Sequence, residues 1–389
     1  MNSLFDVPFI LDGAMGTELK RAGLPIGECT ERWVLENPEA VIKLQRAYAA
    51  AGADAVCAPT FGANRALLKA HGVPGGCVSQ MNRQLVAISF DGVGDRALIA
   101  GDMSPTGLAM PPFGTASFEE LISIFEEQAA ALHEAGVHYF AIETQMLLGE
   151  ARAAVKAVQR VSDRPILCSF TCGSSGCTAM GSSLISGLAV MQDMGVSAYG
   201  VNCCGSFELI NSLLRDMQPI AAIPLSVQPN AGQPVVRDGE VLYTMTPDDF
   251  ASAIPELASA GAGIFGGCCG TTPEHISALK QVLGQVDFQA DTAEAIDSAR
   301  ICASETQVLV YDASCRVSDL AIDDDIIEAA RELTAKGAQL LRIAPRDLQD
   351  VEILLENQYG IRTPLMLDCG DAKLCAKAQH GYHGKLLRL

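Results

Sequence analysis

The chain has 389 residues, of which 49% are hydrophobic and 19% are charged, a composition that excludes intrinsic disorder. The length allows two or three domains of ordinary size, although an α/β barrel uses about 250 residues in one piece. The formal net charge of −19 repels phosphate backbones and anionic lipid surfaces, so we expect no nucleic acid partner and no membrane association.

Short apolar segments alternate with amphipathic helical patterns from the N-terminus to about residue 283, which is typical of βα units. The predicted strands cover residues 8–16, 53–62, 96–105, 137–145, 165–173, 198–205, 223–232 and 261–270. Eight such units predict a (β/α)8 TIM barrel over residues 1–285 rather than an open doubly wound sheet.

Residues 286–306 are acidic, rich in small side chains and weakly patterned, so we expect a linker there. The alternation resumes over residues 307–389, where it predicts a smaller α/β domain with three helices. Its four predicted strands cover residues 307–312, 339–345, 364–370 and 384–389. A sheet of four parallel strands has two open edges, which the barrel, a second copy of the chain or further protein must cover.

Fourteen cysteines are spread along this chain. The first 16 residues lack the basic start of a secretory signal, and no apolar stretch reaches the roughly 18 residues of a membrane span. We therefore expect a cytoplasmic protein whose thiols stay reduced. In that setting clustered cysteines bind metal or act as nucleophiles, while the others pack as small apolar side chains.

Functional groups of a βα barrel lie at the C-terminal ends of the strands, where the loops converge on one mouth. The polar and sulfur-bearing residues at these ends are Asp12, Thr60, Asp102, Glu143, Asn202, Cys203, Cys204, Gln228, Asn230, Cys268 and Cys269. Cysteines from the sixth and eighth strands can meet in the mouth, and three thiolates suit a tetrahedral Zn²⁺ with a vacant fourth position. The spacing leaves open whether Cys203 or Cys204 joins Cys268 and Cys269.

Neighbouring cysteines ordinarily point to opposite faces of a strand, so Cys268 and Cys269 can bind one ion only if the backbone turns between them. Gly266, Gly267 and Gly270 make such a turn sterically accessible. Without the turn, the two thiols would simply pack. The chain has no C-x-x-C motif, which disfavours a thioredoxin-like redox site.

Several motifs follow one another in the order LDGAMGTEL, AGADAV, TFGANR, IET, GVNC, VQPNAGQPV and GGCCGTTPEHI. Over about residues 8–283 they resemble the homocysteine S-methyltransferase family, and VQPNAG is most similar to the homocysteine-binding module of cobalamin-dependent methionine synthase. The resemblance implies a barrel in which Cys203, Cys268 and Cys269 hold Zn²⁺ as the catalytic centre, and it selects against Cys204.

The resemblance further implies methyl transfer to the thiol of L-homocysteine, giving methionine. A free thiol with a pKa of about 8.5 is mostly protonated at neutral pH, whereas coordination to zinc removes its proton. Asp12 and Glu143 would hold the substrate ammonium, with Thr60 and backbone N–H groups near Gly13 beside them. Asn202 would support the zinc loop.

The sequence departs from close relatives before TFGANR, where Cys57 and Pro59 replace polar residues. We expect Cys57 to pack rather than to approach the metal. Two roles are left open for Asp102, Gln228 and Asn230. They could orient the methyl donor, or they could form hydrogen bonds that cap the strand ends.

We expect the methyl donor to be methylcobalamin, either free or carried by a separate corrinoid protein. One alternative is S-methylmethionine or another methyl-onium compound. Another is a noncatalytic module that binds homocysteine and zinc and docks a corrinoid protein.

Residues 307–389 resemble, less specifically, the first half of a pterin-binding barrel such as the methyltetrahydrofolate module of the same synthase. Asp368 would match an acidic strand-end residue of that family. However, the sequence ends at the fourth strand, and Leu387 and Arg388 stand where relatives offer an Asn. We therefore expect no self-contained folate site, and Asp368 as a structural cap remains an alternative.

Overall fold

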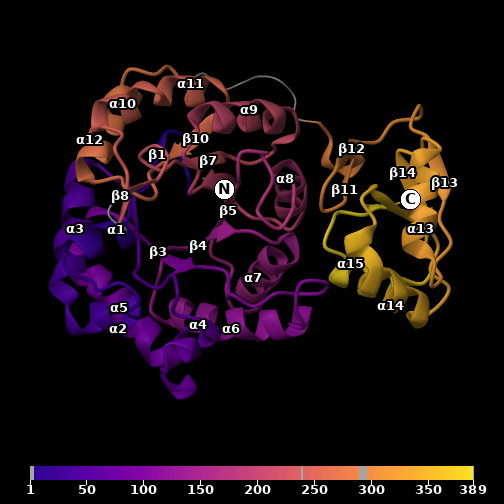
Figure 1. Cartoon of the computed structure of the whole chain (residues 1–389), viewed down its shortest axis with the longest axis horizontal. Helices are drawn as coiled ribbons and strands as arrows, with labels where there is room; N and C mark the ends of the chain where they lie inside the picture. Colours follow the sequence, from indigo (N-terminus) through magenta and orange to yellow (C-terminus); the bar gives the residue numbers. More distant parts are fainter. Residues whose placement is uncertain (1–3, 238–239, 289–295, 389) are drawn as a thin grey trace.

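The larger part of the protein is a barrel of parallel strands, and the computed structural model describes residues 4–237, 240–288 and 296–388 (Figure 1). The barrel strands are β1 (Phe9–Ile10), β2 (Ala55–Cys57), β3 (Leu98–Met103), β4 (Tyr139–Gln145), β5 (Ile166–Phe170), β6 (Ala198–Asn202), β7 (Leu225–Gln228) and β10 (Ala262–Phe265). They pair in the order β1-β10-β7-β6-β5-β4-β3-β2. The eight predicted strands and the TIM barrel are therefore confirmed.

Asp54 joins the two strands at which this order ends. Its N–H donates to the carbonyl of Ile10 at 2.7 Å, and its Oδ2 accepts the N–H of Ile10 at 2.8 Å. These bonds bring β1 beside β2, so the eight strands form a nearly closed cylinder.

Helices follow the strands and cover the outside of the cylinder (Figure 1). They are α1 (Gly16–Arg21), α2 (Thr30–Glu36), α3 (Pro38–Ala51), α4 (Arg65–Ala70), α5 (Val78–Val93), α6 (Phe118–Glu134), α7 (Leu148–Val161), α8 (Leu184–Asp193), α9 (Phe207–Met217), α10 (Pro247–Ser252), α11 (Ile254–Ser259) and α12 (Pro273–Leu283). Local sequence sets their ends: the Ser117 hydroxyl accepts the N–H of Glu120 to start α6, and Gly52 ends α3 with a φ of +104°. Among the described residues, every helix is too short or too polar to cross a bilayer.

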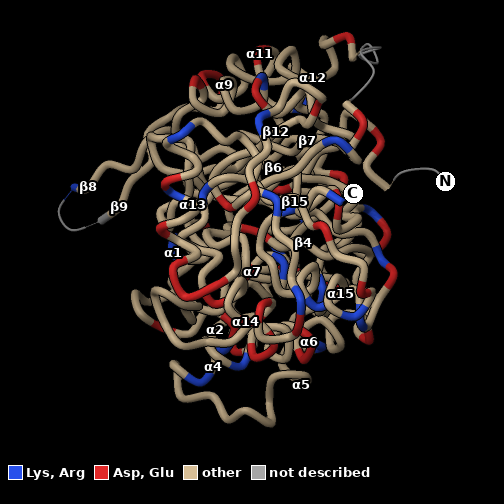
Figure 2. Tube along the Cα trace, turned by 90° about the vertical axis from the view of Figure 1, so that its right-hand side faces the viewer, with Lys and Arg blue, Asp and Glu red and all other residues tan. Residues whose placement is uncertain are grey.

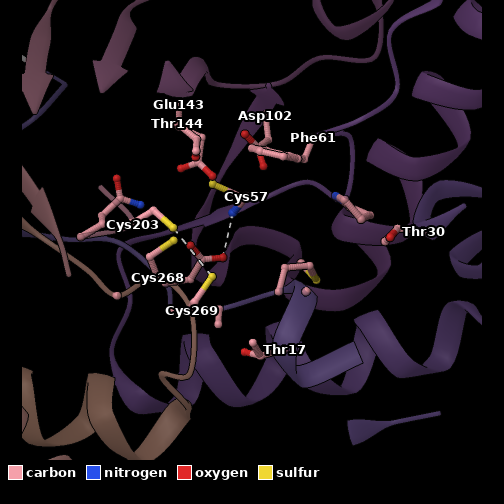
Figure 3. Close-up of a pocket in the computed structure, with 18 of the residues that line it drawn as sticks. Thr17, Thr30, Cys57, Phe61, Asp102, Glu143, Thr144, Cys203, Cys268 and Cys269 are labelled. Atoms are coloured by element: carbon pink, nitrogen blue, oxygen red, sulfur yellow. Dashed lines mark hydrogen bonds between the residues drawn. The ribbon is translucent and has the colours of Figure 1, made fainter. Parts of the chain in front are cut away.

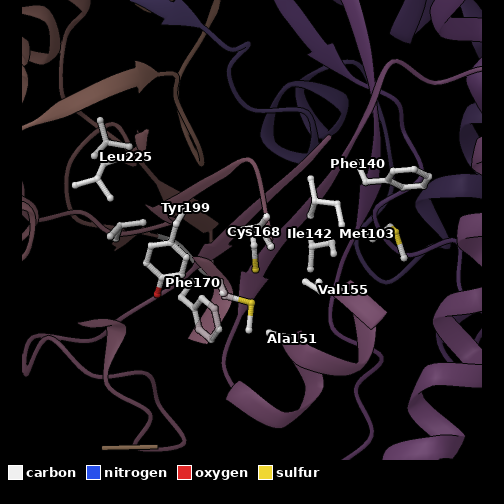
Figure 4. Close-up of a cluster of buried hydrophobic side chains, with 14 of the residues drawn as sticks. Met103, Phe140, Ile142, Ala151, Val155, Cys168, Phe170, Tyr199 and Leu225 are labelled. Carbon is white, nitrogen blue, oxygen red and sulfur yellow. The ribbon is translucent and has the colours of Figure 1, made fainter. Parts of the chain in front are cut away.

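Alternation along each strand divides the core into two layers. On β4, Tyr139 and Ala141 point into the cylinder and meet Phe5, whereas Phe140 and Ile142 pack outward under the helices (Figure 4). Burying one such large side chain stabilises the fold by about 1.5–3 kcal/mol. The inner layer closes the lower part of the cylinder and leaves the C-terminal strand ends as the place for a cavity.

The C-terminal part contains a second parallel sheet with the order β13-β14-β15-β16. Its elements are β13 (Val317–Asp319), α13 (Ile326–Ala335), β14 (Leu340–Ile343), α14 (Leu348–Asn357), β15 (Leu365–Leu367), α15 (Ala372–Gly381) and β16 (Leu387–Arg388). Four strands and three helices were predicted, but the first strand was placed wrongly. It is β13, whose Val317 and Asp319 are exposed at the sheet edge, so it lacks the apolar pattern of a buried strand.

The segment predicted as the first strand of that sheet forms a hairpin instead. Its β12 (Val308–Val310) pairs antiparallel with β11 (Ile301–Ala303), and this β11–β12 hairpin lies between α8 and the C-terminal sheet (Figure 1). Ile301 and Ala303 are buried in the core outside the barrel strands, while Cys302 packs against the C-terminal sheet.

The predicted linker, residues 286–306, therefore includes a strand. A three-residue strand that is buried on both faces shows no polar alternation, which explains why the sequence pattern did not reveal it. Residues 289–295 of the predicted linker lie outside the described residues.

We expect Ile301→Ala to lower the free energy of unfolding by about 2–4 kcal/mol, because the residue is fully buried in the barrel core. The matched control is Ile26→Ala, whose side chain is 87% exposed and whose loss should cost less than about 0.5 kcal/mol. Urea unfolding measures both. Equal small losses would show that residue 301 belongs to an unstructured linker.

Candidate functional site

A cavity of about 270 Å³ opens at the C-terminal ends of the barrel strands (Figure 3). This volume lies just below the usual range of about 300–1,000 Å³ for drug-sized ligands, so the cavity suits a smaller molecule. The residues that line it include Asp12, Gly13, Cys57, Phe61, Asp102, Glu143, Thr144, Cys203, Gln228, Cys268 and Cys269.

Three thiols meet on one side of this cavity. The Sγ atoms of Cys203, Cys268 and Cys269 all lie within 4.8 Å of one another, and those of Cys203 and Cys269 are 3.9 Å apart (Figure 3). Two sulfur ligands placed 2.3 Å from a tetrahedral zinc ion would be about 3.8 Å apart. The three sulfurs therefore fit a single Zn²⁺ ion.

The backbone turns sharply where Cys268 and Cys269 stand next to each other. The N–H of Thr271 donates to the carbonyl of Cys268 at 3.1 Å, and Gly270 has a φ of +83°. A Cβ at Gly270 would lie 2.3 Å from the Cβ of Tyr243, so only glycine fits there. The predicted turn is confirmed, and it directs two successive side chains toward Cys203.

Two strand ends beside the thiols adopt backbone conformations that are rare for residues other than glycine. Among the described residues, the ones other than glycine that have a positive φ are Thr144, with a φ of 58°, and Cys203, with a φ of 55°. Each such residue costs about 1–3 kcal/mol unless its surroundings hold it. Asn202 holds Thr144, accepting its N–H at 3.0 Å and donating to its hydroxyl at 2.8 Å.

Carboxyl groups also line the cavity. Oxygens of Asp102 and Glu143 and the Sγ of Cys57 lie within 4.8 Å of one another, and Oδ1 of Asp102 is buried without a hydrogen-bond partner. Oδ2 of Asp12 accepts the N–H of Cys57 at 2.9 Å. No Lys, Arg or His is found among the described lining residues, so this part of the cavity suits a cation.

Burial changes the protonation of these carboxyl groups. It raises the pKa of Asp12 to about 8, and the nearby Glu143 adds to this effect. Burial and the charge of Cys269 raise the pKa of Glu143 to about 7, while a hydrogen bond from Gln228 opposes them. Burial, followed by the charge of Glu143, also raises the pKa of Asp102 well above its ordinary value. A cationic group placed among them would favour their charged forms.

The thiols also influence one another. Hydrogen bonds from Cys203, Cys268 and Tyr243 lower the pKa of Cys269 to about 3, while the bonds to Cys203 and Cys269 raise the pKa of Cys268. The sulfur of Cys269 is therefore the first of the three to carry charge.

Tyr243 was not among the predicted site residues. It directly follows the antiparallel strands β8 (Val235–Arg237) and β9 (Glu240–Leu242), which project from the barrel (Figure 2). It lies close enough to Cys269 to lower the pKa of that thiol. The clue in the sequence was the position of Tyr243 between the VQPNAG motif and the next helix. A tyrosine in such a connection can place its polar hydroxyl at the mouth of the barrel.

The cavity brings together most of the residues singled out from the sequence, namely Asp12, Gly13, Glu143 and the three cysteines. Thr60 lies behind the lining, where its hydroxyl donates to the carbonyl of Asp102 at 2.9 Å. Asn202 also lies behind it, in the contact with Thr144.

Cys57 and Cys204 occupy different positions relative to the cavity. Cys57 packs against the inner core, as expected, and lies outside the group of three thiols, but it also lines the cavity beside Asp102 and Glu143. Cys204 is 5% exposed and lies outside the group of three thiols.

Comparisons with known proteins agree with this site. A family model described as homocysteine S-methyltransferase matches residues 9–283. Methionine synthase of Mycobacterium tuberculosis is 29% identical over 409 aligned residues, which cover 95% of this chain and 34% of that protein. Methionine synthase of Mycobacterium leprae is 30% identical over 282 residues, which cover 68% of this chain and 23% of that protein. The chain thus spans about a third or less of these relatives.

Solved structures match the barrel. The metallated form of the homocysteine methyltransferase MmuM from Escherichia coli has a TM-score of 0.61 and 27% identity, covering 71% of this chain and 96% of that chain. The oxidized form of the same enzyme has a TM-score of 0.59 at 27% identity, covering 70% and 95%.

We expect the stability of the ligand-free protein to fall as pH rises from about 4 to about 8. The pKa of Asp12 is raised from 3.8 to about 8, so the folded state binds more protons than the unfolded chain within this window. Asp12→Asn should flatten the fall, whereas Asp6→Asn, at an exposed position, should leave it unchanged. Urea unfolding at several pH values measures the effect, and parallel curves for all three proteins would contradict it.

Proposed function

The chain belongs to the homocysteine S-methyltransferase family, and we propose that its barrel transfers a methyl group to the thiol of L-homocysteine, giving methionine. The observation that carries this proposal is the arrangement of the cavity. Three thiols that fit a zinc ion and a separate group of carboxyls line the same cavity. A small molecule with a thiol at one end and an ammonium at the other matches both groups.

We propose Cys203, Cys268 and Cys269 as the residues that hold Zn²⁺. A zinc ion bound there would remove the proton of the substrate thiol and keep its sulfur nucleophilic at neutral pH. Tyr243 lies beside them and favours the thiolate form of Cys269. Asn202 acts from the neighbouring position on β6, where it holds the end of β4 in its unusual conformation.

Asp12 and Glu143 are the proposed partners of the substrate ammonium. Asp12 is buried and Glu143 half-buried, and both have a raised pKa, so a positive charge between them restores their ionised forms. Gly13 lines the same end of the cavity, where a Cβ would lie 2.8 Å from Oγ1 of Thr271. Thr60 contributes indirectly, because its hydroxyl bonds to the backbone of Asp102 rather than facing the cavity.

The proposed methyl donor is methylcobalamin or a methylated corrinoid protein. Both are large, and three connections that follow barrel strands carry exposed apolar side chains: Phe61 is 39% exposed, Phe113 60% and Val236 72%. Exposed apolar groups around a site favour contact with a large or protein partner. The similarity to methionine synthases supports the same choice. S-methylmethionine and a noncatalytic module that docks a corrinoid protein are the competing proposals.

We propose that the chain divides into the barrel of residues 1–285 and a C-terminal part of residues 307–389 that resembles half of a pterin-binding barrel. The β11–β12 hairpin covers one face of the C-terminal sheet, with Cys302 and Leu309 packed on Leu340 and Met366. A pterin has no room on that face, so the proposed role of this part is to support the barrel.

We propose a cytoplasmic location. All described cysteines are free of disulfide bonds, which suits a reducing compartment.

We expect Cys203→Ser, Cys268→Ser and Cys269→Ser each to lose zinc and methyl transfer. The loss of affinity should exceed the roughly 10–100-fold change that follows from altering a group hydrogen-bonded to a ligand. Cys204→Ser is the matched control and should keep its zinc, since its thiol lies outside the group. Zinc content after dialysis at a fixed free zinc concentration measures the effect. Equal zinc in all four variants would contradict the ligand assignment.

A panel of donors tests the reaction itself. The purified full chain is mixed with zinc, L-homocysteine and one of three donors: methylcobalamin, a methylated corrinoid protein or S-methylmethionine. We expect methionine with one or both corrinoid donors. Methionine with S-methylmethionine alone would overturn the donor proposal, and tight homocysteine binding without turnover for any donor would favour the noncatalytic module.

A further inference from the structure

A second pair of thiols lies next to the proposed zinc ligands but outside the cavity. Cys172 follows the end of β5, and Cys204 follows the end of β6 directly after Cys203. The thiols of Cys172 and Cys204 lie close enough to shift each other's pKa, and Cys177 also acts on Cys172. Neither member of the pair lines the cavity or belongs to the group of three sulfurs.

The strands that carry this pair are neighbours in register. Phe170 of β5 pairs with Val201 of β6 in a parallel ladder, and neighbouring strands lie about 4.8 Å apart. Beyond the ladder, the hydroxyl of Thr171 donates to the carbonyl of Cys203 at 3.3 Å, so the two chain segments stay side by side. A disulfide needs Cα atoms about 4.4–6.8 Å apart. Cys172 and Cys204 directly follow the two residues joined by this hydrogen bond, so they lie on adjacent chain segments where such an approach is available.

The two thiols differ in access to solvent. Cys172 is partly exposed, whereas Cys204 is only 5% exposed and packs in the barrel core. A small oxidant can therefore reach the pair from the side of Cys172, with Cys204 positioned behind it to complete a bond.

We propose that Cys172 and Cys204 are a modification site, at which a peroxide forms a reversible disulfide that loosens the hold of Cys203 on its metal. One thiolate attacks the peroxide oxygen, becomes a sulfenic acid and releases hydroxide. The second thiol then displaces the hydroxyl of the sulfenic acid as water, forming the S–S bond. Two thiols and one hydrogen peroxide thus give one disulfide and two waters, and a dithiol reverses the step.

The effect on the metal follows from the position of Cys203. An S–S bond of about 2.05 Å is shorter than a thiol hydrogen bond, so Cys204 must move toward Cys172 when the bond forms. Cys203 is one peptide bond away, with a φ of 55° that leaves it little conformational freedom. We expect the Sγ of Cys203 to move away from that of Cys269, which would lower the affinity for zinc. The expected loss is about tenfold, which is the lower end of the range for changes to groups beside a metal ligand. This consequence rests on the proposed zinc site, whereas the disulfide itself does not.

The test uses the full chain loaded with zinc, which protects the three proposed ligands, and treats it with hydrogen peroxide. Peptide mapping should find Cys172 linked to Cys204, the intact mass should show the loss of two hydrogens, and dithiothreitol should restore it. A chromogenic chelator should remove zinc faster from the oxidised protein than from the reduced one. All these readouts are independent of methyl transfer, so they remain informative whatever the donor panel shows.

Two serine variants make the test specific. Cys172→Ser should form no such disulfide and should keep its zinc under peroxide, while Cys177→Ser, a matched change in the same loop, should behave as the unmodified chain does. A linkage from Cys172 to Cys177, or peroxide-induced zinc loss in Cys172→Ser equal to that of the unmodified chain, would overturn the proposal.

Discussion

The site depends on one constraint, which is that three sulfur atoms from two strand ends occupy a space only a few ångströms across. The requirement is met by backbone conformation rather than by side-chain length. Gly270 takes a left-handed conformation so that adjacent cysteines face the same way, and Cys203 does so without being a glycine. The hydrogen bonds between Asn202 and Thr144 stabilise the neighbouring strand end. Much of the local sequence around the mouth serves this geometry.

The barrel and its grouped cysteines could be predicted because both leave strong marks in the sequence. Eight repeats of apolar strand and amphipathic helix specify the cylinder, and position at a strand end then predicts which side chains approach one another. What the pattern could not give was the direction of single residues. Cys57 faces the cavity and Thr60 does not, because β2 ends at Cys57 and the chain turns before Thr60, whose N–H donates to the carbonyl of Ala58.

The C-terminal part was harder to predict for a different reason. Its edge strand β13 is short and exposed, and β11 is short and buried on both faces, so neither shows the alternation that identifies longer strands. Contacts distant in sequence decide their pairing. The hydroxyl of Ser182 donates to Glu305 at 2.9 Å, which ties the loop after β5 to the segment beside β11. Such a bond between distant segments has no local signature.

The β11–β12 hairpin also bears on how the protein is made. Ile301 and Ala303 complete the layer outside the barrel strands, yet they come after the last barrel helix in the chain. During synthesis, the cylinder therefore stays without part of its outer cover until the ribosome has released the residues beyond 303. Nascent barrels held on the ribosome short of that point expose apolar surface that the finished molecule conceals, and a chaperone is suited to shield it in the interval.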